Sequence, residues 1–336
     1  MTSREVTARA MEFKQPPRIP LNVFFNGGPH NDAIRNEVWA AFSPNISDII
    51  MTFQGDPLFV PEEEGLTEWG YRWDSFGETR GEVTDPPIKD WSDFDAWRDK
   101  FPDFSTPRRY SASRKLRADN PDKFIIAGLG LQATEHVNLR GFGPSMEDLY
   151  IERENVERLL DVIYTASAQM IDGYASAGAD AVISWEDWGL QDRAIIDPKL
   201  WREIYFDRMK KIVDRAHKHG MKYILHSCGY IPDYFDMFIE LGIDALSLDQ
   251  QLNMGLETLS KWRGRICFCN PVDIQHSPKM SDAEIKDHAH RMAKLLGTED
   301  GGFIYNMYAD PKAIQMPAKN IISEIQAFQS VSLTTQ

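Results

Sequence analysis

The sequence predicts a (β/α)8 barrel, and three observations lead to this fold class. Short apolar or β-branched runs alternate with longer amphipathic runs, which is typical of βα units around a parallel sheet. Eight such short runs are present, the number of strands that closes a barrel. The length of 336 residues suits one domain of this kind, because the fold uses about 250 residues and tolerates insertions.

The expected strands are spaced so that most pairs leave room for a helix between them. In order they cover residues 18–25, 47–53, 124–130, 180–186, 222–226, 244–249, 265–270 and 302–306. Capping signals mark several helices. Ser92, Ser145 and Ser281 each have an acidic residue three positions later, the spacing of a helix N-cap. Asp197 precedes a proline suited to a first helical position, and Gly220 predicts the end of that helix.

One segment interrupts this alternation. Residues 54–123 are rich in Trp, Tyr, Gly and Glu, and they predict a β-hairpin and one helix inserted after the second strand. An insertion at that point lies over the mouth of a barrel, where loops often shape the binding site. The alternative is an ordinary surface flap. Apart from this insertion, residues 1–336 are expected to form a single barrel domain.

Composition excludes several classes of protein. The chain has 37 basic and 51 acidic residues, a net charge of −14, which argues against nucleic acid or an anionic membrane as the main partner. Three cysteines are too few for a disulfide framework. The N-terminus is polar, and no run reaches the roughly 20 apolar residues of a membrane span. We therefore expect a cytoplasmic protein.

Polar and aromatic residues follow most of the expected strands. In a parallel barrel the active site lies at the carboxyl ends of the strands, so these side chains are expected to converge there. The candidates for substrate binding are Asn26, Trp185, Gln191, Gln250, Asn270, Tyr305, Asn306 and Tyr308. The candidates for catalysis are His226, Glu186, Asp187 and Asp249.

His226 and Cys228 are the most informative pair. At positions i and i+2 near a strand end, both side chains point to the same side. One imidazole and one thiolate suit zinc, with further ligands from elsewhere. The alternative is a hydrogen-bonded histidine and a small packed cysteine on a turn. Cys269, at the end of the seventh expected strand, is a candidate third ligand or else a packed core residue.

The carboxylates have competing interpretations as well. Glu186 or Asp187 is expected to act as a general acid or base, or as a metal ligand. The alternative for either is a solvent-exposed carboxylate or one that caps a helix. Asp249 ends an otherwise apolar run, so its carboxylate needs a partner, and His226 is the obvious candidate.

Several motifs together resemble the uroporphyrinogen decarboxylase (URO-D) superfamily. These are residues 226–229 (HSCG) with the IPDYFDMFIELGIDAL that follows, the start of the chain through 17–20 (PRIP), residues 186–191 (EDWGLQ) before 198–203 (PKLWRE), and 301–304 (GGFI). The similarity runs over nearly the whole chain. It implies a (β/α)8 barrel, in agreement with the strand count, and suggests a homodimer.

The resemblance is closer to one of two branches. Members that decarboxylate uroporphyrinogen III work without metal and hold substrate carboxylates with an arginine-rich segment after strand one. Here residues 24–30 read FFNGGPH, with no arginine before Arg35. The other branch contains zinc-dependent methyltransferases, whose zinc is held by a His-x-Cys pair and a later cysteine near strand eight. His226 and Cys228 match the pair, whereas residues 305–310 contain no cysteine.

The resemblance therefore implies a methyltransferase with zinc as cofactor. The expected reaction moves a methyl group from a small methylated substrate, such as a methoxylated aromatic compound, to a corrinoid protein, or from the corrinoid to an acceptor. Either Cys269, Glu186 or Asp187 completes the metal site, or the metal is missing. The first alternative is a metal-free decarboxylase of a small acid, for which Arg35, Arg140 and Arg193 are the candidate cations. The second is a barrel that binds a small molecule without catalysis.

Overall fold

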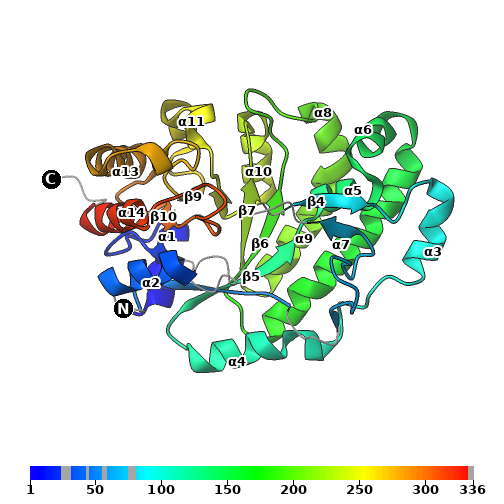
Figure 1. Ribbon diagram of the computed structural model, residues 1–336, viewed down its shortest axis with the longest axis horizontal. Helices are drawn as coiled ribbons and strands as arrows, with labels where there is room; N and C mark the ends of the chain where they lie inside the picture. Colours follow the sequence, from blue (N-terminus) through cyan, green and yellow to red (C-terminus); the bar gives the residue numbers. More distant parts are fainter. Residues whose placement is uncertain (24–31, 43–44, 55–58, 75–80, 332–336) are drawn as a thin grey trace.

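The computed structural model describes residues 1–23, 32–42, 45–54, 59–74 and 81–331. Its eight parallel strands form a nearly closed barrel with helices around the outside (Figure 1). The strands are β1 (Leu21–Asn22), β2 (Ile49–Thr52), β5 (Phe124–Gly130), β6 (Ala181–Glu186), β7 (Lys222–Ser227), β8 (Ala245–Ser247), β9 (Cys267–Asn270) and β10 (Phe303–Asn306). The order β1-β10-β9-β8-β7-β6-β5-β2 follows the chain. The predicted fold class is confirmed.

The helices are placed as a barrel requires, mostly between consecutive strands. They are α1 (Ser3–Met11), α2 (Asp32–Ala41), α3 (Phe94–Arg98), α4 (Ser111–Asp119), α5 (Ala133–Arg140), α6 (Phe142–Ile151), α7 (Arg153–Ser176), α8 (Pro198–Trp201), α9 (Asp207–Lys218), α10 (Phe235–Leu241), α11 (Gln251–Met254), α12 (Leu256–Leu259), α13 (Asp282–Leu296) and α14 (Ala318–Ser330). None of the helices in the described ranges is long and apolar enough to cross a membrane.

Two of the four predicted helix starts are confirmed. Ser281 forms a full capping box at the start of α13, and Asp197 accepts the backbone N–H of Lys199 at the start of α8. The helix that follows Asp197 contains a π-helical segment, Arg202–Phe206, between α8 and α9. The chain leaves α9 through Gly220, whose φ of 75° is the left-handed conformation expected at a helix end.

The other two predicted starts are wrong. Asp90 is the N-cap of the short 3-10 turn before α3, and its carboxylate accepts the N–H of Ser92. Ser145 lies inside α6, which begins at Phe142 directly after Gly141. The φ of 87° at Gly141 turns the chain into a helix four residues earlier than the serine pattern predicts.

The 54–123 segment contains the predicted hairpin. Strands β3 (Arg72–Asp74) and β4 (Glu82–Asp85) pair antiparallel. Two α-helices, α3 and α4, follow the hairpin instead of the one predicted. Arg109, buried before α4, binds Glu68 through two hydrogen bonds of 2.9 and 2.6 Å and also donates to the carbonyl of Asp103. This bidentate contact fixes the segment before the hairpin to the start of α4.

Three aspartates link strands to one another at the amino-terminal end of the barrel. Asp48 accepts the N–H of Leu21, Asp180 accepts that of Ile125, and Asp244 accepts that of Tyr223. Each aspartate precedes one strand and binds the first residues of the strand before it. At the β1–β2 seam, the backbone N–H of Asp48 also donates to the carbonyl of Leu21 at 2.8 Å. These two hydrogen bonds between Leu21 and Asp48 join β1 to β2, which share no regular ladder.

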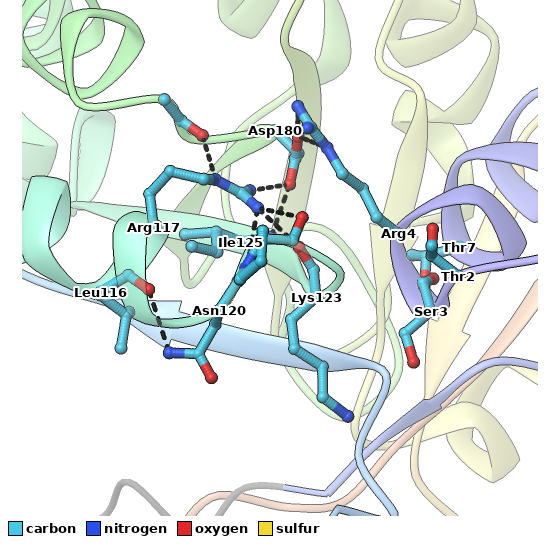
Figure 2. Close-up of polar contacts among 12 residues, drawn as sticks. Thr2, Ser3, Arg4, Thr7, Leu116, Arg117, Asn120, Lys123, Ile125 and Asp180 are labelled. Atoms are coloured by element: carbon cyan, nitrogen blue, oxygen red, sulfur yellow. Dashed lines mark hydrogen bonds and ion pairs between the residues drawn. The ribbon is translucent and has the colours of Figure 1, made fainter.

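Helix α1 covers the amino end of the barrel. Ala10 and Met11 pack against the residues that face the lumen, and the N-cap Thr2 forms a capping box with Glu5. Figure 2 shows how Asp180 ties this helix down, because its carboxylate lies between Arg4 of α1 and Arg117 of α4. The Asp180 side chain is only 7% exposed. The two guanidinium groups therefore compensate a buried negative charge.

Replacing Asp180 with alanine is expected to lower the free energy of unfolding by about 3 kcal/mol, because Arg117 would lose its carboxylate partner and the N–H of Ile125 its side-chain acceptor. The measurement is urea denaturation followed by circular dichroism. Asp119→Ala is the matched control, since Asp119 pairs with Lys115 on the exposed surface of α4. The control is expected to cost no more than about 0.5 kcal/mol. Equal losses in the two variants would contradict the assigned role.

Candidate functional site

Side chains at every second position of the strands point into the barrel, and this alternation determines which residues lie at its mouth. Apolar side chains at every second strand position fill the lower lumen, and all of them are buried. They are Ile49, Met51, Phe124, Ile126, Ala181, Ile183, Ile224, Ala245, Cys267, Cys269 and Ile304. Two positions further along β6 and β7 stand Trp185 and His226, which are register partners. His226 in turn pairs with Ser247 of β8. Three neighbouring strands therefore bring these side chains to one place above the packed core.

His226, Cys228 and Asp249 form a compact group of metal-ligand types. The Nε2 atom of His226 lies 3.5 Å from Sγ of Cys228 and 3.8 Å from Oδ2 of Asp249. One donor atom from each residue lies within 4.8 Å of the others. Nδ1 of His226 lies 3.2 Å from the Ser247 hydroxyl, so Nε2 is the nitrogen turned toward the other two donors.

The geometry fits a zinc ion. Ligand atoms bonded to tetrahedral zinc at about 2.0–2.3 Å lie about 3.4–3.6 Å from one another. The separations around His226 Nε2 are close to these values. A nitrogen, a thiolate and a carboxylate would provide three protein ligands and leave a fourth position for substrate. The Ser247 hydroxyl would orient the imidazole from behind.

Cys228 is positioned by the contact between two loops. Its N–H donates to the carbonyl of Glu186, and the N–H of Tyr230 donates to that of Leu190. Between these bonds, Gly189 and Gly229 touch backbone to backbone. A Cβ on Gly229 would lie 2.1 Å from the carbonyl oxygen of Gly189, and one on Gly189 would lie 2.4 Å from the nitrogen of Tyr230.

Gln250 adds a third strand end to this arrangement. Its Oε1 atom accepts the N–H of Gly229 at 2.9 Å. The loops after β6, β7 and β8 are therefore joined directly beside the thiol. Gln250 was predicted to bind substrate, and the structure uses its amide oxygen to hold the loop that presents Cys228.

Glu186 caps a helix, which was one of the interpretations that the sequence left open. Its buried carboxylate accepts the N–H groups of Gln132, Ala133 and Thr134 at 3.2, 3.3 and 2.9 Å. The Thr134 hydroxyl adds a fourth bond of 2.8 Å. Burial raises the pKa of Glu186 to about 7, and these donors oppose the shift. The residue thus fixes the start of α5 at the barrel mouth, and the neighbouring Asp187 is exposed.

Cys269 faces the lumen beside this group but lies outside the three donors. It is buried on β9, and burial raises the pKa of its thiol to about 12, with a further contribution from Asp249. The structure places Asp249 beside His226, as the sequence predicted, and groups it with Cys228 as well, whereas the sequence suggested Cys269, Glu186 or Asp187 as the further ligand.

The remaining predicted residues divide between the mouth and the wall. Trp185 lies at the mouth, Asn306 accepts a hydrogen bond of 2.6 Å from Asn22, and Gln191 binds Asn253 on the rim. Asn270 and Tyr305 brace the wall. Asn270 accepts the N–H of Leu248, and Tyr305 donates to Glu324 of α14 while stacking on Phe328. Tyr308 lines a small hollow with Glu324 beyond β10. Asn26 lies outside the described residues.

Sequence reasoning missed Phe53, Gly128 and Ser247. The available signal was strand alternation, because Phe53 follows Ile49 and Met51 at even spacing, and Ser247 precedes Asp249 in the same way. Glu135 of α5 was also missed. Burial raises its pKa to about 8, and the side-chain amide of Asn138 donates to its carboxylate at 3.4 Å. No pattern in the sequence marks that carboxyl group as buried.

Comparison with known proteins agrees with this fold. The family model described as uroporphyrinogen decarboxylase (URO-D) matches residues 75–324. The chain belongs to the URO-D family. A curated uroporphyrinogen decarboxylase from Thioalkalivibrio sulfidiphilus (strain HL-EbGR7) is 25% identical over 212 residues, which are 60% of this chain and 57% of that relative. The chain thus spans little more than half the length of that URO-D relative.

A solved structure extends the likeness to the whole barrel. A methyltransferase from Methanosarcina mazei superposes with a TM-score of 0.67, covering 98% of each chain at 14% identity. At this identity the match establishes the shared fold. The URO-D superfamily assignment suggested by the motifs at 186–191 and 226–229 is confirmed, and the chain is a member of an enzyme superfamily.

Proposed function

We propose that this URO-D family protein is a zinc-dependent methyltransferase that exchanges a methyl group between a small methylated substrate and the corrinoid of a partner protein. The observation that carries the proposal is the donor group of His226, Cys228 and Asp249 at the barrel mouth. The Methanosarcina mazei protein of the same fold is a methyltransferase, which supports this direction.

The chemistry of the transfer asks for what this site offers. The bond between the methyl carbon and its heteroatom breaks, the electron pair stays on the heteroatom, which takes up a proton, and the methyl group bonds to the cobalt of cob(I)alamin. Zinc, when bound, would act as a Lewis acid on the leaving heteroatom. His226, Cys228 and Asp249 would hold that ion, and Ser247 and Gln250 would keep two of these groups in position.

A decarboxylase would need cationic side chains to hold its substrate, and the two candidate arginines whose side chains are described are each paired with an aspartate. Arg140 is paired with the buried Asp148 and donates to the carbonyls of Ile88 and Lys89. Arg193 is exposed beside Asp192. The side chain of Arg35 lies outside the described residues. A substrate with several carboxylates would also meet the carboxylate of Asp249 at the mouth.

The direct test is methyl transfer under reducing conditions with zinc-loaded protein and cob(I)alamin. A panel of methyl ethers, methylamines and methyl thioethers is supplied, and methylcobalamin is followed by its absorption spectrum. The reverse arm supplies methylcobalamin and a thiol. We expect turnover in one arm that a zinc chelator abolishes and added zinc restores. Release of carbon dioxide from small acids, unaffected by the chelator, would overturn the proposal in favour of a decarboxylase, and ligand binding without turnover would favour a binding protein.

A further inference from the structure

An aromatic pair stands beside the donor group at the barrel mouth. The rings of Phe53 and Trp185 have centroids 5.8 Å apart and planes 22° from parallel. Trp185 is the register partner of His226, so the pair adjoins the histidine across neighbouring strands. Phe53 comes from the end of β2, on the far side of β5 from Trp185.

Strand β5 carries no side chain where these rings lie. Gly128 is beneath them, and a Cβ there would be 2.6 Å from the ring of Phe53 and 3.0 Å from that of Trp185. Gly130 lies two positions nearer the mouth, and no described residue lies within 4 Å of the place where its Cβ would be. The missing side chain at Gly128 therefore lets both rings lie close against β5.

Phe53 is exposed to a degree that the barrel itself does not explain. Its side chain is 46% exposed, whereas Ile49 and Met51 on the same strand face are buried. Large aromatic side chains stabilise a protein mainly through the area they bury, so an open ring at the mouth suggests a contact made with a ligand.

We propose that Phe53 and Trp185 form the binding surface for a planar aromatic ring of the methyl donor. The inference rests on the proposed function, because it places the ring next to the groups that would hold the leaving heteroatom. Two nearly parallel rings offer a flat face to a third ring. A quaternary ammonium group is usually enclosed by rings set at angles to one another, which this pair is not.

The test compares the binding of methoxybenzene and methoxycyclohexane, which share a methoxy group and ring size but differ in planarity. Affinities are measured by ligand-observed NMR titration of the zinc-loaded protein. We expect the planar ether to bind roughly threefold to tenfold more tightly. In Phe53→Leu and Trp185→Leu the ratio is expected to fall to about one. Phe142→Leu, at an exposed aromatic residue of α6, is the matched control and is expected to keep the ratio.

The outcomes separate this inference from the proposed function. A ratio near one in the unchanged protein, an unchanged ratio in both variants, or a preference for tetramethylammonium would overturn the inference. Zinc content and methyl transfer from non-aromatic donors are measured on the same samples. If zinc and methyl transfer are both absent while ring selectivity depends on Phe53, the proposed function fails and the ring-binding surface stands. If zinc and methyl transfer are both present without ring selectivity, the proposed function stands and the ring-binding surface fails.

Discussion

Cys228→Ser and His226→Ala are each expected to lower the affinity for zinc by more than about 100-fold and to abolish methyl transfer. Each change removes one of three grouped donors, and the separations of the other two from His226 Nε2 are close to those of a tetrahedral site. The hydroxyl of serine is a much poorer zinc ligand than a thiolate. Metal content after dialysis, measured by mass spectrometry, is the primary readout, and circular dichroism checks that the fold is retained.

The identity of the third donor is decided by a matched pair of variants. Asp249→Asn is expected to lose zinc as Cys228→Ser does, because Asp249 lies 3.8 Å from Nε2 of His226. Cys269→Ser is expected to keep it, because that thiol is buried outside the donor group. Stoichiometric zinc in both His226→Ala and Cys228→Ser would contradict the site, and zinc loss confined to Cys269→Ser would contradict this choice of ligand.

Gly189→Ala is expected to lower the free energy of unfolding by about 3 kcal/mol and to weaken zinc binding. Its Cβ would lie 2.4 Å from the nitrogen of Tyr230 and 2.5 Å from the carbonyl carbon of Gly229. Both obstacles are backbone atoms, so no side-chain rotation relieves the overlap. The loops after β6 and β7 must separate, and the hydrogen bond that positions Cys228 is then lost.

Gly143→Ala is the control for this variant. Gly143 lies in α6, and no described residue lies within 4 Å of the place where a Cβ would be, so alanine is expected to be neutral or stabilising by about 0.5–1 kcal/mol. Urea denaturation and zinc content are measured on both proteins. If Gly189→Ala behaves like Gly143→Ala in both measurements, the loop contact does not hold the site.

Much of the barrel is predictable from local pattern alone. The eight strands lie where short apolar runs occur, because a strand buried on both faces needs such a run. The capping box at Ser281 is also local, since all its groups lie within four residues. The predicted cap at Ser145 failed because Gly141 had already turned the chain into α6. The serine pattern and the glycine predict different helix starts there, and the helix begins after the glycine.

The side-chain roles near the mouth were harder to predict. Asn270 and Tyr305 end strands as active-site residues do, yet their side chains bind Leu248 and Glu324 within the wall. A strand has two faces, and the face that looks into the lumen depends on register with its neighbours. Glu186 caps α5 because β5 and β6 are adjacent, a fact that spacing along the chain does not contain.

The sequence by itself determined the strand positions, the net charge and the His226–Cys228 pair, because each depends on residues close together in the chain. Only the tertiary structure decided that Asp249, expected beside His226, also lies near Cys228, that Gly189 and Gly229 hold the loop of Cys228, and that Phe53 lies against Trp185. Those contacts join residues from different strands. Their distances follow from how the barrel closes, which no local pattern encodes.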